Sequence, residues 1–217
     1  MRVYTKNLKG LLTKEEHKVF SRLNTPQKIQ DFLDALPINF EPEGDTLHSP
    51  RLVMQHKTAH CMEGALFAAA ALAYHGQRPL LLDLQTLAHD DDHVVTLFQE
   101  KGGWGAISKT NHAILRWRDA VYKTPRELAM SFFHEYYLDD GVKTLKAFSK
   151  PFDLRRYKPE QWVTTEGNID FIAEELDESP HVSIIPNGAR RRLRKTTLLE
   201  RHMLKFAEWK RNKTKLF

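Results

Sequence analysis

The chain has 217 residues, of which 41% are hydrophobic and 28% charged, a composition typical of a globular protein large enough to bury a substantial core. It contains no run of roughly 18 apolar residues, so we expect no transmembrane segment, and the first nine residues lack the apolar stretch of a signal peptide. The single cysteine excludes an internal disulfide. We therefore expect a reducing, cytoplasmic setting.

The net charge of +5 is unevenly distributed. Residues 188–217 hold eleven Lys and Arg residues but only two acids, whereas the remainder of the chain is mildly acidic. We predict one domain over residues 1–187, with N-terminal helices, followed by a basic C-terminal helical tail over 188–217. An anionic partner, either nucleic acid or an acidic protein surface, would suit this tail, and a solvated helix is the simpler alternative.

The N-terminal third reads as helices followed by a long loop. The segment Thr13–Glu16 has the form of a capping box and predicts a short helix. Thr25 and Pro26 predict a second helix, because a capping residue precedes proline at the first helical position. Residues 37–52 carry three prolines and a glycine and are expected to form a loop.

The middle of the chain predicts a buried helix and then strands. An alanine-rich, apolar helix starts at about Cys61 and ends near Gly76. Two buried strands, a glycine-rich turn and an antiparallel return strand follow: Pro79–Leu84, His93–Gln99, Lys101–Gly105 and Ala106–Thr110. Further elements are a helix from Thr124 to about Tyr136, a helix over Asn168–Leu176, a linker over Pro180–Gly188 and a C-terminal helix opened by Thr197. This order predicts an α+β fold in which a central buried helix packs on an antiparallel sheet.

Cys61 is the strongest candidate for a catalytic residue. It lies at the predicted helix start, where the partial positive charge of the helix end favours a thiolate over a thiol. The alternative is a buried structural cysteine, which behaves as a small hydrophobe. Next to it, His60 is positioned to tune the thiol, and Glu63 to interact with the helix end.

His93 and Asn111 are candidates for the other members of a catalytic triad. A histidine can take the thiol proton, and a third polar residue can hold the imidazole in the required tautomer. If the hairpin turn is centred on Gly102, residues 93 and 111 face each other across neighbouring strands. A shift of one residue would place His112 there instead.

Gln55 lies six residues before Cys61. A side-chain amide on the approach to the helix, together with the backbone N–H of Cys61, would form an oxyanion hole. We therefore predict that Gln55 is an oxyanion donor.

The order Gln-x5-Cys, His on a strand and Asn after a hairpin resembles the papain-like cysteine hydrolases, and the segment from His93 to Gly105 is closer to their transglutaminase-like branch. In that branch a glycine-rich turn is followed by Trp, and an acid then closes the next strand. The equivalent spacing falls on Ser108 here, three residues before Asn111. The resemblance covers residues 53–115 and implies a papain-like fold. It also implies acyl transfer at an amide or peptide bond through a thioester, with no cofactor.

Two alternatives come from other functional classes. A catalytically inactive transglutaminase-like protein would act as a binding or scaffold protein. A metal-dependent hydrolase would use His89, Asp90 and His93, because histidine and carboxylate are ligands for zinc, iron or manganese. In an extended strand successive side chains point to opposite faces, which disfavours a metal site built from adjacent residues, and we predict none.

Overall fold

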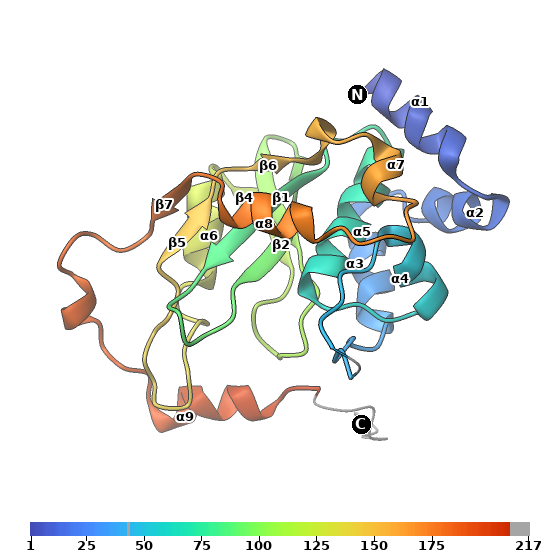
Figure 1. The fold of residues 1–217 in the computed structure, drawn as a ribbon. Helices are drawn as coiled ribbons and strands as arrows, with labels where there is room; N and C mark the ends of the chain where they lie inside the picture. The colour runs from blue at the N-terminus through green and yellow to red at the C-terminus, as the bar shows by residue number, and fades with distance from the viewer. Residues whose placement is uncertain (43, 209–217) are drawn as a thin grey trace.

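The computed structural model describes residues 1–42 and 44–208 and shows an α+β fold with an antiparallel sheet (Figure 1). The helices in these residues are α1 (Arg2–Leu11), α2 (Lys14–Arg22), α3 (Pro26–Ala35), α4 (Pro50–His56), α5 (Cys61–Tyr74), α6 (Pro125–Phe132), α7 (Pro159–Trp162), α8 (Asp170–Asp177) and α9 (Leu198–Arg201). Short 3-10 helices span Leu154–Arg156, Arg190–Arg192 and His202–Lys205. None of these helices has both the length and the apolar character needed to cross a membrane.

The sheet runs in the order β4-β3-β2-β1-β5-β7, with β6 also paired to β1, and every pairing is antiparallel. Its strands are β1 (Leu80–Gln85), β2 (His93–Glu100), β3 (Gly103–Ile107), β4 (Arg118–Tyr122), β5 (Ala147–Ser149), β6 (Phe152–Asp153) and β7 (His181–Ser183). The two predicted buried strands are therefore β1 and β2, which lie at the centre of the sheet.

Both faces of the central strands are buried, which explains their nearly continuous apolar sequences. Leu81 of β1 and Phe98 of β2 belong to the core that surrounds α5. Leu82 and Leu97 belong to a second core on the other face, which includes residues of α6. All residues of α5 except Cys61 are buried, as the apolar sequence of this helix predicts. The sheet thus lies between helices and carries α5 on one face.

The hairpin between β2 and β3 differs in register from the prediction. Glu100 pairs with Gly103 and Thr96 with Ile107, so the loop has only two residues. These are Lys101 and Gly102, both with positive φ, as a tight two-residue turn requires. The prediction centred the turn on Gly102, whereas the observed turn is centred between Lys101 and Gly102. If the ladder continued, position 110 would face His93, so the predicted pairing of His93 with Asn111 is wrong.

Several other boundaries differ from the sequence-based prediction. Part of the expected 37–52 loop is helical, because α4 begins at Pro50 behind the capping residue Ser49. The expected linker contains β7, which pairs with β5. The helix α6 ends at Phe132 and not near Tyr136. Tyr137 instead forms a β-bridge with Lys143.

The basic C-terminal segment is only partly helical. Thr197 and Glu200 form a capping box, but the helix α9 that they open is one turn long. The chain then crosses the loop that follows β3, where Ala207 forms an antiparallel bridge with His112. The part of the predicted basic tail from residue 209 onward lies outside the described residues.

Candidate functional site

The candidate site is built around the N-terminal end of α5. Cys61 is the first residue of this helix, and His60 precedes it as the N-cap. The first N–H groups of a helix have no acceptor within the helix, so the backbone N–H of Cys61 is available at the site. Cys61 is partly exposed and lines a cavity of about 210 Å³.

Two histidines interact with the Cys61 sulfur. Burial alone would raise the pKa of the thiol, but hydrogen bonds from His60 and His93, together with their charges, outweigh burial and lower it to about 5. The sulfur is therefore a thiolate at neutral pH. A cysteine in this state is a strong nucleophile, in contrast to an ordinary buried thiol.

His60 is the positively charged partner of this thiolate. Burial would lower the pKa of His60, but the hydrogen bond with Cys61 and the charges of Cys61 and Glu63 raise it to about 9. The imidazole Nε2 also lies 2.9 Å from the carbonyl oxygen of Thr46. A carbonyl only accepts, so this nitrogen carries a proton.

Glu63 is buried, and its carboxylate fixes the backbone of the residues that precede α5. Its carboxylate accepts hydrogen bonds from the backbone N–H of His60 at 2.9 Å and of His48 at 2.9 Å, and from the side chain of Asn39. It also lies 2.8 Å from Nδ1 of His48. The sequence places Glu63 at the helix end but does not indicate the contacts with Asn39 and His48, which come from the preceding loop.

Ser108, directly after β3, contacts the imidazole of His93. Its Oγ lies 2.8 Å from Nε2 of His93 and 2.5 Å from the carbonyl oxygen of Leu115. The hydroxyl proton goes to the carbonyl, because the carbonyl can only accept, so Ser108 accepts a hydrogen bond from Nε2–H of His93. Nδ1 is then the ring nitrogen that can exchange a proton with the Cys61 sulfur.

Gln30 fixes the backbone of Ser108 from the neighbouring helix α3. The side-chain amide donates to the carbonyl oxygen of Ser108 and accepts from its N–H, both at 2.9 Å. Gln30 is buried, and the two residues are 78 positions apart in the chain. No local sequence pattern indicates this contact.

Asn111 lies in the cavity wall but does not contact His93 through a described hydrogen bond. It lines the same cavity as Cys61, as does His112. The backbone carbonyl of Asn111 accepts a hydrogen bond of 2.7 Å from Glu208, so the C-terminal segment contacts this loop directly. Among the described hydrogen bonds, Ser108 and not Asn111 is the residue that contacts the His93 ring.

Gln55 is not part of the site. It is an exposed residue of α4 and lines a different cavity, together with Glu16 and Arg51. No helix was predicted before Cys61, whereas Gln55 lies on α4 and in the wall of that other cavity. The predicted oxyanion-donor role of Gln55 is therefore wrong.

The alternative metal site is not assembled. Within the described residues, the one group of His, Cys, Asp or Glu side chains close enough to share an ion consists of Asp83, Asp92 and Asp177, whose ligand atoms lie within 4.8 Å of one another. His89 is exposed and does not belong to that group. The His89, Asp90 and His93 set is therefore not a ligand site in this fold.

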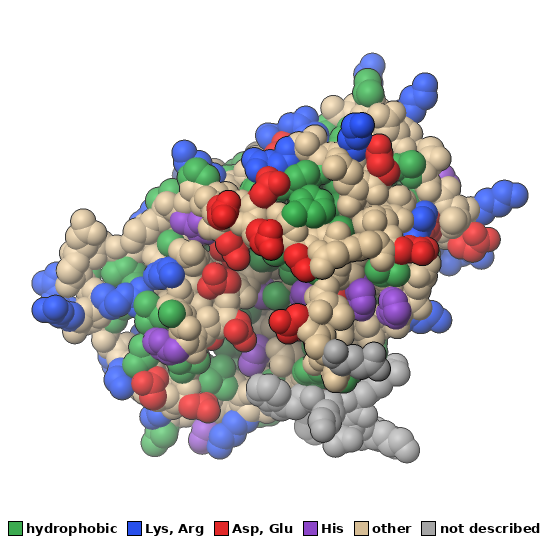
Figure 2. Space-filling model, in the orientation of Figure 1, with side chains coloured by type: hydrophobic (Ala, Val, Ile, Leu, Met, Phe, Trp, Pro, Cys, Tyr) green, Lys and Arg blue, Asp and Glu red, His purple; other side chains and the backbone are tan. Residues whose placement is uncertain are grey.

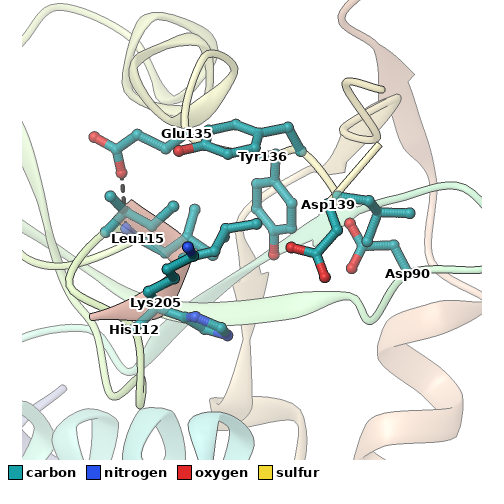
Figure 3. A pocket seen from close by; sticks show the side chains of 11 residues that line it. Asp90, His112, Leu115, Glu135, Tyr136, Asp139 and Lys205 are labelled. Carbon is teal, nitrogen blue, oxygen red and sulfur yellow. Dashed lines mark hydrogen bonds between the residues drawn. The ribbon is translucent and has the colours of Figure 1, made fainter. Parts of the chain in front are cut away.

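A second cavity of about 400 Å³ adjoins the one that contains Cys61 (Figure 3). Asp90, His112, Leu115 and Tyr136 line both cavities, so the two are continuous along these side chains. The C-terminal segment contributes Lys205 to the wall of the second cavity. A molecule that reaches the Cys61 sulfur therefore has adjoining space for an extended group.

The surface is electrostatically uneven on the face drawn in Figure 2. Acidic side chains gather in the middle of this face, over α8 and the neighbouring strands, while many Lys and Arg side chains lie towards its edges. This pattern agrees with a mildly acidic body and a basic C-terminal segment.

The sequence matches no protein-family model and shows no significant similarity to any curated protein.

Proposed function

We propose that this chain is a cysteine-dependent hydrolase or acyltransferase that acts on an amide or peptide bond, with a papain-like fold of the transglutaminase-like kind. The observation that carries the proposal is the Cys61 sulfur at a helix start, held by two histidines, of which His93 is oriented by Ser108. Nucleophile, base and orienting residue in hydrogen-bond contact form the arrangement used in nucleophilic catalysis.

In the first half-reaction, the Cys61 thiolate attacks the carbonyl carbon, while Nδ1 of His93 carries the proton that it has taken from the thiol. The new C–S bond forms while the carbonyl π electrons move to oxygen. The C–N bond then breaks, His93 gives its proton to the leaving nitrogen, and a thioester on Cys61 remains.

In the second half-reaction, His93 takes a proton from water or from an amine, which attacks the thioester carbon. Collapse of this intermediate breaks the C–S bond and returns the electron pair to sulfur. The product is a carboxylic acid when water attacks and a new amide when an amine attacks. His60 keeps its proton throughout and stabilises the thiolate.

The experiment uses p-nitrophenyl acetate, an activated ester that acylates nucleophilic thiols and releases p-nitrophenolate. We expect a burst of about one equivalent and an acetyl group on Cys61 by mass spectrometry. Cys61→Ser should abolish the burst, and His93→Ala should slow acylation by about 10²-fold or more. A native chain that is not acylated at Cys61, or that is acylated equally fast without His93, would contradict the proposal.

A non-catalytic binding protein of the same fold is the second candidate. The observation that favours it is Ser108 itself, because a neutral hydroxyl stabilises an imidazolium less than a carboxylate does. A reactive thiolate without turnover of any amide substrate would support this alternative.

A further inference from the structure

Tyr136 has a buried hydroxyl with no hydrogen-bond partner among the described residues. Only 4% of the residue is exposed. A buried donor that forms no hydrogen bond destabilises a protein, and such groups are rare in native structures. The position of this hydroxyl therefore calls for an explanation.

Tyr136 is part of the site. Tyr136 lines the Cys61 cavity and the adjoining one, and Figure 3 shows its ring between Leu115 and Asp90. Burial raises the pKa of Tyr136 well above its ordinary value, and the negative charge of Cys61 raises it further. The phenol therefore keeps its proton and is a neutral hydrogen-bond donor beside the thiolate.

The proposed reaction needs such a donor. Attack by Cys61 places negative charge on the carbonyl oxygen, and cysteine hydrolases stabilise that charge with two or more preorganised donors. The backbone N–H of Cys61 supplies one. Gln55, the second donor expected from the sequence, lines another cavity.

We propose that the hydroxyl of Tyr136 donates a hydrogen bond to the oxyanion of the tetrahedral intermediate, as the second donor beside the backbone N–H of Cys61. This inference rests on the proposed acyl-transfer function. The proton stays on the phenol oxygen throughout, and the bond is released when the carbonyl re-forms. The missing partner in the resting protein is then the substrate oxygen.

The test compares two reagents on the full chain carrying Tyr136→Phe. The first is p-nitrophenyl acetate, which reacts through a tetrahedral oxyanion. The second is iodoacetamide, which alkylates sulfur by direct displacement at carbon and forms no oxyanion. We expect acylation of Cys61 to slow by about 10²-fold, as for loss of other oxyanion donors, while alkylation changes by less than about threefold.

Tyr157→Phe is the matched control, because Tyr157 is a buried phenol in the core that surrounds α5 and lines neither cavity. It should leave both rates unchanged. The thermal midpoint of Tyr136→Phe should equal or exceed that of the native chain, since the substitution removes only an unpartnered buried hydroxyl. This measurement separates a catalytic loss from a folding defect.

Each outcome decides a different point. If the native chain is acylated at Cys61 and Tyr136→Phe is acylated at the same rate, the oxyanion role is wrong and the proposed function stands. If both reagents slow equally in Tyr136→Phe, the phenol acts on the thiolate and the oxyanion role is again wrong. If the native chain is not acylated, the proposed function and this inference both fail.

Discussion

Ser108 Oγ accepts a hydrogen bond from Nε2–H of His93, over a distance of 2.8 Å. The direction of this bond follows from the second contact of the hydroxyl, which donates to the carbonyl oxygen of Leu115. Two residues that lie 15 positions apart thus set the tautomer of the proposed base. Nδ1, and not Nε2, is left to exchange protons with the Cys61 sulfur.

Ser108→Ala should therefore slow acylation of Cys61. Without the acceptor, the imidazole loses its preferred tautomer and orientation, and we expect a decrease of about 10-fold, within the range for groups that assist a general base. The measurement is the burst rate with p-nitrophenyl acetate. Asn111→Ala serves as the comparison, because its side chain makes no described hydrogen bond to His93, and it should lower the rate less than Ser108→Ala. The reverse ranking would restore Asn111 as the orienting residue.

The rate of Cys61 alkylation by iodoacetamide should reach half its maximum near pH 5. The thiolate is the reactive form, and hydrogen bonds from the two histidines outweigh burial and lower the thiol pKa to about 5. The rate therefore rises as the pH increases through 5, whereas an unfolded cysteine titrates near 8.5. His60→Ala should move the midpoint upward, because it removes a hydrogen bond and a positive charge from the thiolate. A native midpoint near 8.5 would contradict this assignment.

The positions of the proposed nucleophile and the proposed base could be predicted from the sequence because local patterns mark them. An alanine-rich run defines α5 and places Cys61 at its start, and a β-branched and aromatic run defines β2 and places His93 at its start. These two elements pack together through apolar side chains, whose burial the hydrophobic pattern alone predicts. The α+β class with an antiparallel sheet follows from the same patterns.

The remaining members of the site depend on features that are not local. A change of one residue in the length of the β2–β3 turn changes which position faces His93. The turn has only two residues because Lys101 adopts a positive φ, which the sequence does not indicate. The helix α4 begins at Pro50 behind the capping residue Ser49, within a stretch whose prolines predict a loop. Gln55 lies on this helix and therefore does not line the Cys61 cavity. Tyr136 reaches the cavity from beyond the end of α6, with no sequence signal that connects it to Cys61.

Gly64→Ala should destabilise the protein even though alanine is the better helix former. A Cβ at position 64 would lie 2.4 Å from the Cβ of Lys109, which is too close for any real contact. Lys109 cannot move easily, because it is buried and its Nζ donates to the carbonyl oxygen of Leu33 at 2.9 Å. We expect a loss of about 1–3 kcal/mol in the free energy of unfolding, measured with urea.

Gly10→Ala is the control for this substitution. Gly10 is also helical, in α1, but a methyl group added there would meet no atom within 4 Å. Alanine should therefore stabilise the chain at this position by about 0.5–1 kcal/mol. Equal effects at the two positions would show that the contact between α5 and Lys109 is not tight.

His181→Ala should destabilise the protein more at pH 8 than at pH 5. Nε2 of His181 lies 2.8 Å from Oδ2 of the buried residue Asp83, a contact that holds β7 to the sheet through β1. Burial raises the pKa of Asp83 to about 6, against the opposing effect of the His181 hydrogen bond. Asp83 is thus charged at pH 8 and largely neutral at pH 5. At pH 8 the variant leaves an unpaired buried carboxylate, which costs about 3 kcal/mol.

At pH 5 the variant loses only a hydrogen bond to a neutral acid, which is worth about 1 kcal/mol. The sign follows from linkage, because a carboxyl group whose pKa is raised by folding, here from 3.8 to about 6, makes the folded state less stable as the pH rises from the lower value to the higher one. The His181 hydrogen bond lowers the pKa of Asp83, so the loss is larger without it. The measurement is the free energy of unfolding at both pH values. Adding Asp83→Asn to His181→Ala replaces the carboxylate with an amide that does not titrate, so the difference between the two pH values should disappear. A difference that persists in the double variant would show that groups other than Asp83 cause it.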